Sequence, residues 1–437
     1  MNGSKLEAEY TADEVIDATD KMILPGFIDA HIHTSQTMMR GMAQDTKNWM
    51  MKGIEPLRYY MNTAQSSYSS KATVLEALAT GTTTFGESGT PEHIESMDEF
   101  YHQLGVRNNY TVIIYGMRKS KDGNIHALYD LDEAQSEDSL KRNLQIYEKW
   151  KVRSDRVTVN IGAHAPDTLS KEMLIKCKEA SDRYGLKINM HVAQGDREID
   201  QVMMRYGKRS IPFLDELGYI DKNLIAIHLT EATDDETRLM AKKGASMVVC
   251  SGSIGIIDGI VPPAKVFQDA GGYVALGTDQ ASGNNCNQII NEMKLTALFN
   301  KIKYRDPEVM PSWRLLRMAT IEGAKVLGLD HKIGSLKEGK QADIVFIDLN
   351  AITMMPAIRK PYRNMVPNLV HSARGNEVCR VMVDGRTLYE DGEYKTVDAS
   401  SIIEGFKHQA DDFYENTQYG EEIKVSLGYQ LQEKGLL

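Results

Sequence analysis

The 437-residue sequence is poor in cysteine and has no long apolar run. Its four cysteines form neither a C-x-x-C pair nor a disulfide-like framework: Cys177, Cys250, Cys286 and Cys379. This usage fits a reducing compartment. No stretch reaches the ~18 apolar residues of a membrane span, and residues 1–20 lack the basic and apolar regions of a signal peptide. We therefore expect a cytoplasmic protein that spans no membrane.

Basic residues are also fewer than acidic residues. The chain has 51 lysines and arginines against 61 aspartates and glutamates, which gives a formal net charge of −10. Nucleic acids and anionic membranes attract basic surfaces, so neither is an expected partner. A small neutral or cationic ligand suits this charge balance better. With 42% hydrophobic and 26% charged residues, the composition is that of an ordinary globular protein.

Short β-rich runs alternate with longer segments that have helical character. Eight such runs are candidate strands, at residues 23–30, 82–86, 109–115, 157–162, 186–190, 224–227, 245–249 and 273–276. The segments between them are long enough for crossover helices, and the clearest predicts a helix at 70–80. This alternation is typical of a parallel (β/α)8 TIM-like barrel. We expect an α/β fold in which residues 23–325 form that barrel.

The pattern changes beyond the predicted barrel. A turn-rich stretch at 334–343 leads into an apolar run at 344–349, and a second run at 378–383 precedes a turn. We expect residues 326–400 to form a small accessory β-sandwich domain, with residues 1–22 as its shortened N-terminal part. Residues 401–437 have helical character. This tail is expected either to cap the chain's own barrel or to pack on a second subunit of a homo-oligomer.

Polar residues at the ends of the predicted strands form a candidate metal site. The active site of such a barrel lies at the C-terminal ends of its strands. His31 and His33 follow the first strand, and their i, i+2 spacing places both rings on one face. His191 ends the fifth strand, His228 the sixth and Asp279 the eighth. Imidazoles with a carboxylate suit one divalent ion, with Zn2+ expected and Fe2+ as the alternative.

The chemistry of such a site is hydrolytic. A bound divalent ion lowers the pKa of water toward neutrality. Asp279 is then placed to take a proton from that water, and His228 to hold or polarise the attacked group. The alternative is a structural role for each residue: single histidines at strand ends are commonly structural, and Asp279 can cap the next helix. Convergence from four strands favours the metal site.

Four segments carry a resemblance to a known family. They are 25–33 (PGFIDAHIH), 81–84 (GTTT), 276–279 (LGTD) and 339–345 (GKQADIV). Across essentially the whole chain the sequence resembles the metal-dependent amidohydrolase superfamily. It is most similar to the deaminase and chlorohydrolase branch, which includes S-adenosylhomocysteine/methylthioadenosine, cytosine and guanine deaminases and triazine hydrolases. The resemblance implies a mononuclear site with His31, His33, His191 and Asp279 as ligands and His228 beside the reacting water.

The first departure from the family pattern lies after the fifth strand. The family has His-x-x-Glu, whose glutamate shuttles a proton to the substrate ring, whereas this chain has Gln194 at that position. An amide cannot carry this proton and can only donate or accept hydrogen bonds. Either another acid takes the role or the substrate needs no such protonation. The nearby candidates are Glu87, Asp196, Glu198 and Glu231.

Further departures concern the substrate pocket. Relatives that act on nucleosides have a ribose-binding glutamate in the loop after the first strand, where this chain has Arg58. The usual histidine motif after the seventh strand is replaced by residues 250–253 (CSGS). Both changes favour a compact ring over a nucleoside. His164 matches a position that contacts substrate in the family, and Gln280 is expected to reach into the pocket.

The leading hypothesis is a hydrolytic deaminase. It would release ammonia from a small cyclic amidine or guanidine such as creatinine, or from a pyrimidine, purine or aminotriazine ring. The expected catalytic residues are Asp279, His228 and Gln194, and the expected substrate contacts are His164, Gln194, Arg58 and Gln280. The alternatives are a chlorohydrolase, N-alkylaminohydrolase or cyclic amidase of the same superfamily, and a non-catalytic binding or scaffold protein.

Overall fold

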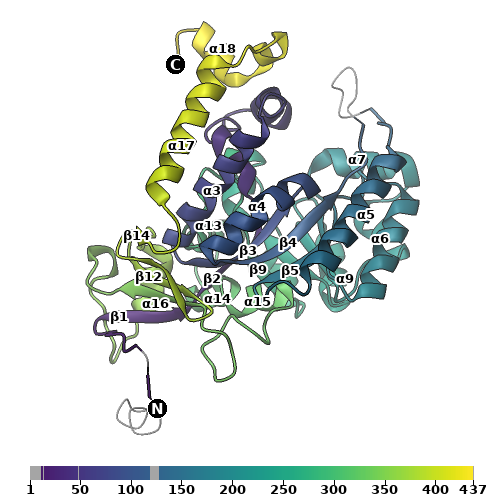
Figure 1. Ribbon diagram of the computed structural model, residues 1–437. Helices are drawn as coiled ribbons and strands as arrows, with labels where there is room; N and C mark the ends of the chain where they lie inside the picture. Colours follow the sequence, from purple (N-terminus) through teal and green to yellow (C-terminus); the bar gives the residue numbers. More distant parts are fainter. Residues whose placement is uncertain (1–10, 13, 48, 119–126, 437) are drawn as a thin grey trace.

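The computed structural model describes all residues except 1–10, 13, 48, 119–126 and 437. Its larger part is a closed barrel of parallel strands surrounded by helices (Figure 1). Within the described residues, the strands of this sheet follow the order β10-β2-β3-β4-β5-β6-β7-β8-β9. Their bounds are β2 Phe27–His33, β3 Thr82–Gly89, β4 Arg107–Ile114, β5 Val157–Ala163, β6 Ile188–Val192, β7 Leu224–His228, β8 Ser246–Val249, β9 Val274–Leu276 and β10 Asp279–Gln280. The TIM-like barrel predicted from the sequence is confirmed.

Two of the predicted strands are each divided. The run at 23–30 consists of β1 (Lys21–Pro25), which belongs to a separate sheet, and β2 of the barrel. They separate at Gly26, where a Cβ would collide with the side chain of Thr83. The eighth strand is interrupted at Gly277, where a Cβ would lie 2.8 Å from the His31 carbonyl oxygen. The second half, β10, pairs with β2 and closes the barrel.

Helices cover the outside of the barrel. Several begin at a side chain that accepts a hydrogen bond from the first turn, such as Asn62, Thr90 and Ser170. The predicted helix at 70–80 is longer and starts at Thr63. The helix bounds are α2 Glu55–Arg58, α3 Thr63–Ala79, α4 Pro91–Leu104, α5 Glu133–Trp150, α6 Lys171–Tyr184, α7 Gly195–Tyr206, α8 Ser210–Glu216, α9 Asp234–Lys242, α10 Ser251–Ile257, α11 Ala264–Asp269, α12 Ala281–Asn284, α13 Ile289–Tyr304, α14 Ser312–Met318, α15 Ile321–Leu327 and α16 Met365–His371.

The chain ends form the second sheet, which is antiparallel. Its order is β1-β11-β12-β13-β14, with β11 Ile344–Asp348, β12 Val378–Val383, β13 Arg386–Glu390 and β14 Glu393–Tyr394. The strands predicted near 344–349 and 378–383 are confirmed. A buried ion pair ties this sheet to the barrel, since Arg107 of β4 donates to both carboxylate oxygens of Asp343 at 2.8 and 2.9 Å.

The C-terminal tail is not one helix. It consists of α17 (Ala399–Asp411), the short turns η4 (Asp412–Asn416) and η5 (Glu421–Val425), and α18 (Leu427–Glu433). Figure 1 shows α17 running up beside α3, toward the loops above the barrel. Phe413 is fully buried in a cluster with Met38 and Met39, which belong to the turn η1 (Thr34–Met39) after β2. The tail therefore packs on the chain's own barrel.

Among the described residues, no helix is both long enough and apolar enough to cross a bilayer.

Candidate metal centre and active site

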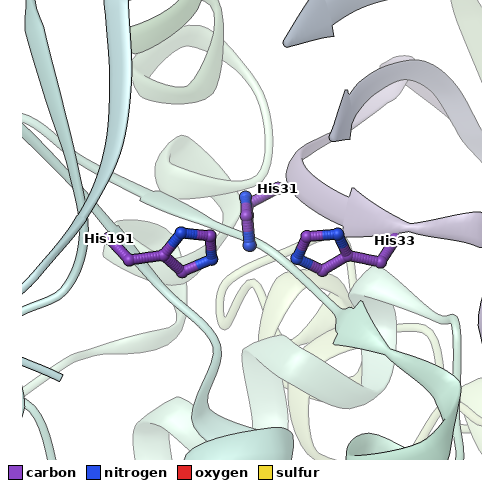
Figure 2. Close-up of side chains that lie close together, drawn as sticks. All are labelled: His31, His33 and His191. Carbon is purple, nitrogen blue, oxygen red and sulfur yellow. The ribbon is translucent and has the colours of Figure 1, made fainter. Parts of the chain in front are cut away.

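Five side chains converge at the C-terminal mouth of the barrel. His31 and His33 come from β2, His191 from β6, His228 from β7 and Asp279 from β10. Figure 2 shows His31 between His33 and His191, with ring nitrogens of all three directed toward one another. The structure thus brings together the whole metal-site set predicted from the sequence.

The spacing of these groups matches a metal site. One ring nitrogen from each of His31, His33 and His191 lies within 4.8 Å of the others, and the same holds for ligand atoms of His31, His228 and Asp279. Asp279 Oδ1 is 3.7 Å from His31 Nε2 and 3.6 Å from His33 Nε2. These separations leave space for a cation between the nitrogens and the carboxylate, because ligand bonds to Zn2+ are about 2.0–2.2 Å long.

Hydrogen bonds fix which nitrogen of two imidazoles faces the centre. His33 Nδ1 lies 2.9 Å from the carbonyl oxygen of Ser88, and His191 Nδ1 lies 3.0 Å from that of His164. A carbonyl oxygen only accepts, so each Nδ1 carries the proton and each Nε2 presents a lone pair. Such outer hydrogen bonds orient histidine ligands in metal sites.

The other two imidazoles are buried without hydrogen bonds. Among the described residues, neither ring nitrogen of His31 or of His228 has a partner. Leaving buried polar atoms unpaired is costly. A divalent cation bound at the centre would satisfy His31 directly, so the residues present fit such an ion.

The histidines are held in the neutral form that binds metals. Burial lowers the pKa of His33 to about 3 and that of His191 to about 4. Burial also lowers the pKa of His31 and His228 well below its ordinary value, and neighbouring imidazoles add to this effect. All four rings are therefore unprotonated near neutral pH.

Asp279 is the buried acid of the centre. Burial raises the pKa of its carboxyl group to about 7, although a hydrogen bond from Ser253 opposes the shift. Ser253 Oγ donates to Oδ2 at 2.7 Å, which leaves Oδ1 toward the histidines. The backbone of Asp279 is left-handed, with φ of 61°, and this turns the residue into the mouth.

A second buried aspartate joins the two strands that carry the ligands. Asp29 Oδ1 accepts from the backbone N–H groups of His31 at 3.3 Å and Thr278 at 3.0 Å. Its Oδ2 accepts from Thr278 Oγ1 at 2.5 Å. One side chain therefore fixes β2 against the segment that leads into Asp279.

The predicted substrate contacts lie at different depths. His164 follows β5; its ring centroid is 4.9 Å from that of His191 and 5.1 Å from that of Tyr115. Gln280 is buried beside the Asp279 carboxylate. Arg58 is more exposed, at 55% of its side chain, and lies 3.5 Å from Glu55. Burial and neighbouring imidazoles are the larger causes of the low pKa of His33 and His164, and the positive charge of Arg58 lowers both pKa values further.

Comparison with known proteins agrees with this geometry. The model of the Amidohydrolase family matches residues 22–388. The chain belongs to the amidohydrolase family. It is 33% identical over 400 residues to a 5-methylthioadenosine/S-adenosylhomocysteine deaminase of Moorella thermoacetica, covering 91% of this chain and 88% of the relative. A 5'-deoxyadenosine deaminase of Methanosphaera stadtmanae is 32% identical, with 90% and 88% covered.

Solved structures show the same fold. An adenosine deaminase from Xanthomonas campestris with bound zinc has a TM-score of 0.81 at 25% identity and covers 90% of this chain and 86% of its own. An atrazine chlorohydrolase from Arthrobacter aurescens has a TM-score of 0.80 at 18% identity, with 90% and 88% covered. As an amidohydrolase, the chain is a hydrolase acting on carbon–nitrogen bonds other than peptide bonds, and the family indicates a divalent metal.

Two acids considered as replacements for the missing glutamate already have partners. Glu198 accepts from the backbone N–H groups of Ala193 and Gln194 at 2.7 and 3.0 Å. Glu87 accepts from Tyr101 Oη at 3.3 Å and lies 3.5 Å from His93 Nε2. Glu198 thus holds the loop after β6, and Glu87, which lies on β3, contacts two residues of α4.

The other two candidate acids are Glu231 and Asp196. The backbone N–H of Glu231 donates to the Ala193 carbonyl at 2.8 Å. The side chain of Asp196 lies outside the described part of the structure. The role assigned to Gln194 stays a prediction.

Sequence patterns did not identify several residues of this amidohydrolase site. Asp29 lies within the segment 25–33 and Ser253 within the segment 250–253, but neither pattern predicts a role for these two residues. No sequence pattern singles out Tyr115, Asp167 or Arg197 as a site residue. For Arg197 a signal existed, because it is a charged residue three positions after Gln194, at the mouth end of β6.

Proposed function

We propose that this amidohydrolase is a metal-dependent hydrolytic deaminase that releases ammonia from an amino-substituted ring carbon next to a ring nitrogen. The observation that carries the proposal is the convergence of His31, His33, His191, His228 and Asp279 at one mouth, with neutral imidazoles and an acid beside them. The deaminase relatives support the bond type.

The metal ligands in this proposal are His31, His33, His191 and Asp279, with Zn2+ as the expected ion. When bound, that ion supplies Lewis acidity and makes water a nucleophile near neutral pH. The donor set of nitrogens and one carboxylate oxygen is typical of zinc hydrolases.

The chain's own groups perform the proton transfers. Asp279 takes a proton from the attacking water and passes it to the leaving amine. His228 is neutral and fully buried, and it polarises the attacked group and stabilises the charge that develops there. His164 and Gln194 orient the ring by hydrogen bonds, with Gln280 and Arg58 as further contacts.

The first substrate class to test is an aminopurine. The relatives are named for 5-methylthioadenosine, S-adenosylhomocysteine and 5'-deoxyadenosine, all of which carry an adenine ring. Compact rings form the second class: creatinine, cytosine and aminotriazines. Arg58 and residues 250–253, which replace family features that suit a nucleoside, support this second class.

A second reaction is favoured by Gln194. If the substrate ring needs no proton from this position, the same centre suits loss of chloride or an alkylamine from a triazine, or opening of a cyclic amide. Product analysis separates these reactions, because only deamination releases free ammonia and leaves the ring intact.

The test is ammonia release by zinc-loaded protein with adenosine, methylthioadenosine, guanine, cytosine, creatinine and ammeline. Asp279→Ala should abolish release, whereas Asp269→Ala, which removes an exposed aspartate of α11, should not. Release from one compound, lost only in Asp279→Ala, supports the deaminase. Silence across the panel with zinc bound refutes it and favours the second reaction.

A further inference from the structure

A buried glutamate lies behind the part of the barrel mouth that carries Asp279. Glu292 is on α13, and its side chain is fully buried. The backbone N–H of Gly252, in the first turn of α10, donates to Glu292 Oε2 at 3.1 Å. The side-chain amide of Asn284, in α12, donates to Glu292 Oε1 at 2.9 Å. One carboxyl group therefore joins three helices.

Each of these donors lies next to a group that contacts or carries Asp279. The N–H donor of α10 directly precedes Ser253, whose hydroxyl donates to Asp279 Oδ2 at 2.7 Å. The amide of α12 also donates to the carbonyl oxygen of Thr278 at 2.7 Å, and Thr278 directly precedes Asp279. Glu292 thus connects the hydroxyl that holds the Asp279 carboxylate with the backbone that carries it.

The glycine of α10 is required by the same arrangement. A Cβ at Gly252 would collide with the side-chain oxygen of Asn284 and with the carboxyl group of Glu292. Any larger residue would push that carboxyl group away from α10. The segment 250–253, where the chain departs from the histidine motif of its family, is therefore shaped to admit the Glu292 side chain.

A purely structural role explains why α13 packs on α10 but not why a carboxyl group lies there. Thr296, one turn further along α13, already joins the two helices, because its hydroxyl lies 2.7 Å from that of Ser251. Within the described part of the chain, the hydrogen-bond donors to Glu292 are uncharged, and a buried acid without a cation is unfavourable. Two converging donors need an accepting oxygen each, whereas a glutamine would place an NH2, which only donates, against one of them.

We propose that Glu292 is a positioning residue of the metal centre: through α10 and α12 it keeps Asp279 Oδ2 on the Ser253 hydroxyl and leaves Oδ1 for the metal ion. Oδ1 is the oxygen that lies 3.7 Å from His31 Nε2 and 3.6 Å from His33 Nε2. Outer hydrogen bonds of this kind orient ligands and affect metal affinity. The kinetic part of this inference rests on the proposed deaminase function. The metal-binding part does not, because it is measured without substrate.

The first test measures zinc affinity by competition with a chromogenic chelator. Ser253→Ala should lower this affinity about tenfold or more. Glu292→Gln should lower it less, because its amide oxygen can still accept one of the two hydrogen bonds. The double variant should lose less than the product of the two single losses, since both changes act on the same carboxylate. Circular dichroism of each metal-free variant checks that it is folded.

The second test uses cobalt(II) in place of zinc, because its visible spectrum reports the number of ligand atoms. Freeing Oδ2 in Ser253→Ala or Glu292→Gln lets the Asp279 carboxylate bind through both oxygens, which adds a ligand atom and lowers the absorption. Thr296→Val is the matched control, since it removes a buried contact between α13 and α10 that does not reach Ser253. It should keep zinc affinity within about threefold of wild type and leave the cobalt spectrum unchanged.

The outcomes separate this inference from the proposed function. In protein that releases ammonia, Glu292→Gln should lower kcat more than it changes KM, because it acts through Asp279. Weaker zinc binding and a changed cobalt spectrum in Glu292→Gln, without ammonia release by the wild type, support the inference and count against the deaminase. Wild-type zinc affinity and spectrum in Glu292→Gln overturn the inference, even if the wild type releases ammonia. Single losses that multiply in the double variant, or an equal loss in Thr296→Val, also overturn it.

Discussion

The ion pair between Arg107 and Asp343 gives a prediction about how the two sheets are held together. Both side chains are 2% exposed. Arg107 donates from Nε at 2.8 Å and from Nη2 at 2.9 Å to the two oxygens of Asp343, and from Nη1 to the Asp155 carbonyl at 3.0 Å. Asp343 Oδ1 also accepts from the backbone N–H of Asp384 at 2.9 Å. The carboxylate thus fixes β4 of the barrel and the turn after β12.

Asp343→Ala should be strongly destabilising. It removes two of the three acceptors of the buried Arg107 guanidinium, leaves its positive charge uncompensated, and leaves the Asp384 N–H without a partner. Breaking one side of a buried pair costs about 3–5 kcal/mol. Asp343→Leu combined with Arg107→Leu removes both charges, and we expect it to recover part of that loss, because the desolvation cost disappears with them.

The free energy of unfolding is measured by urea denaturation followed by circular dichroism. Asp269→Ala serves as the matched control, because Asp269 pairs with Lys265 four residues earlier on the surface of α11. Exposed pairs of this kind contribute about 0.3–0.5 kcal/mol. If Asp343→Ala unfolds within ~1 kcal/mol of the wild type, the pair does not hold the sheets together and the reasoning is wrong.

Three further predictions concern the site and its surroundings. Asp29→Asn should keep both the free energy of unfolding and the zinc affinity close to wild type, because its amide oxygen can accept from the two backbone N–H groups and its NH2 can donate to Thr278 Oγ1. Asp29→Ala should lower the free energy of unfolding by at least about 2 kcal/mol and bind zinc more weakly in a competition with a chelator. Burial raises the pKa of Glu292 to about 8, so as the pH rises this carboxyl group ionises in the unfolded protein before it ionises in the folded protein, and the free energy of unfolding falls between about pH 4.5 and pH 8. In metal-free protein, the stability of Glu292→Gln relative to wild type should therefore increase across this pH range. A stability difference that does not change with pH contradicts the pKa shift. Phe413→Ala should lower the free energy of unfolding by about 3–5 kcal/mol and release the C-terminal tail from the barrel. Proteases should then cleave the chain faster after α17. An unchanged cleavage rate would show that other residues hold the tail.

The barrel and the metal-site residues could be predicted because their signals are local. Each strand buries a short apolar run, and turn-rich or helical segments follow it at regular intervals. In a parallel barrel, the residue that follows each strand lies at the same end as its counterparts, whatever the sequence distance between them. His31, His191 and Asp279 could therefore be grouped before any distance was known.

The divided strands and the path of the tail depended on contacts that a single segment does not reveal. The run at 23–30 is continuous in hydrophobicity, yet close packing at Gly26 against Thr83 separates β1 from β2. The sequence of the tail contains scattered apolar residues, but it does not show which part of the protein they pack against. Only the fold shows Phe413 beside Met38 and Met39.

The amino-acid sequence by itself determined the alternation of strands and helices, the family, and the set of side chains that can bind a metal, since each depends on residue type and spacing along the chain. The tertiary structure decided how that set is supported. Asp29 reaches Thr278, Asp343 reaches Arg107, and Arg197 reaches Asp167, across gaps in sequence that no pattern links. Burial then changes the chemistry of these groups, because the pKa of a carboxyl or imidazole depends on the solvent and charges that surround it in the folded protein.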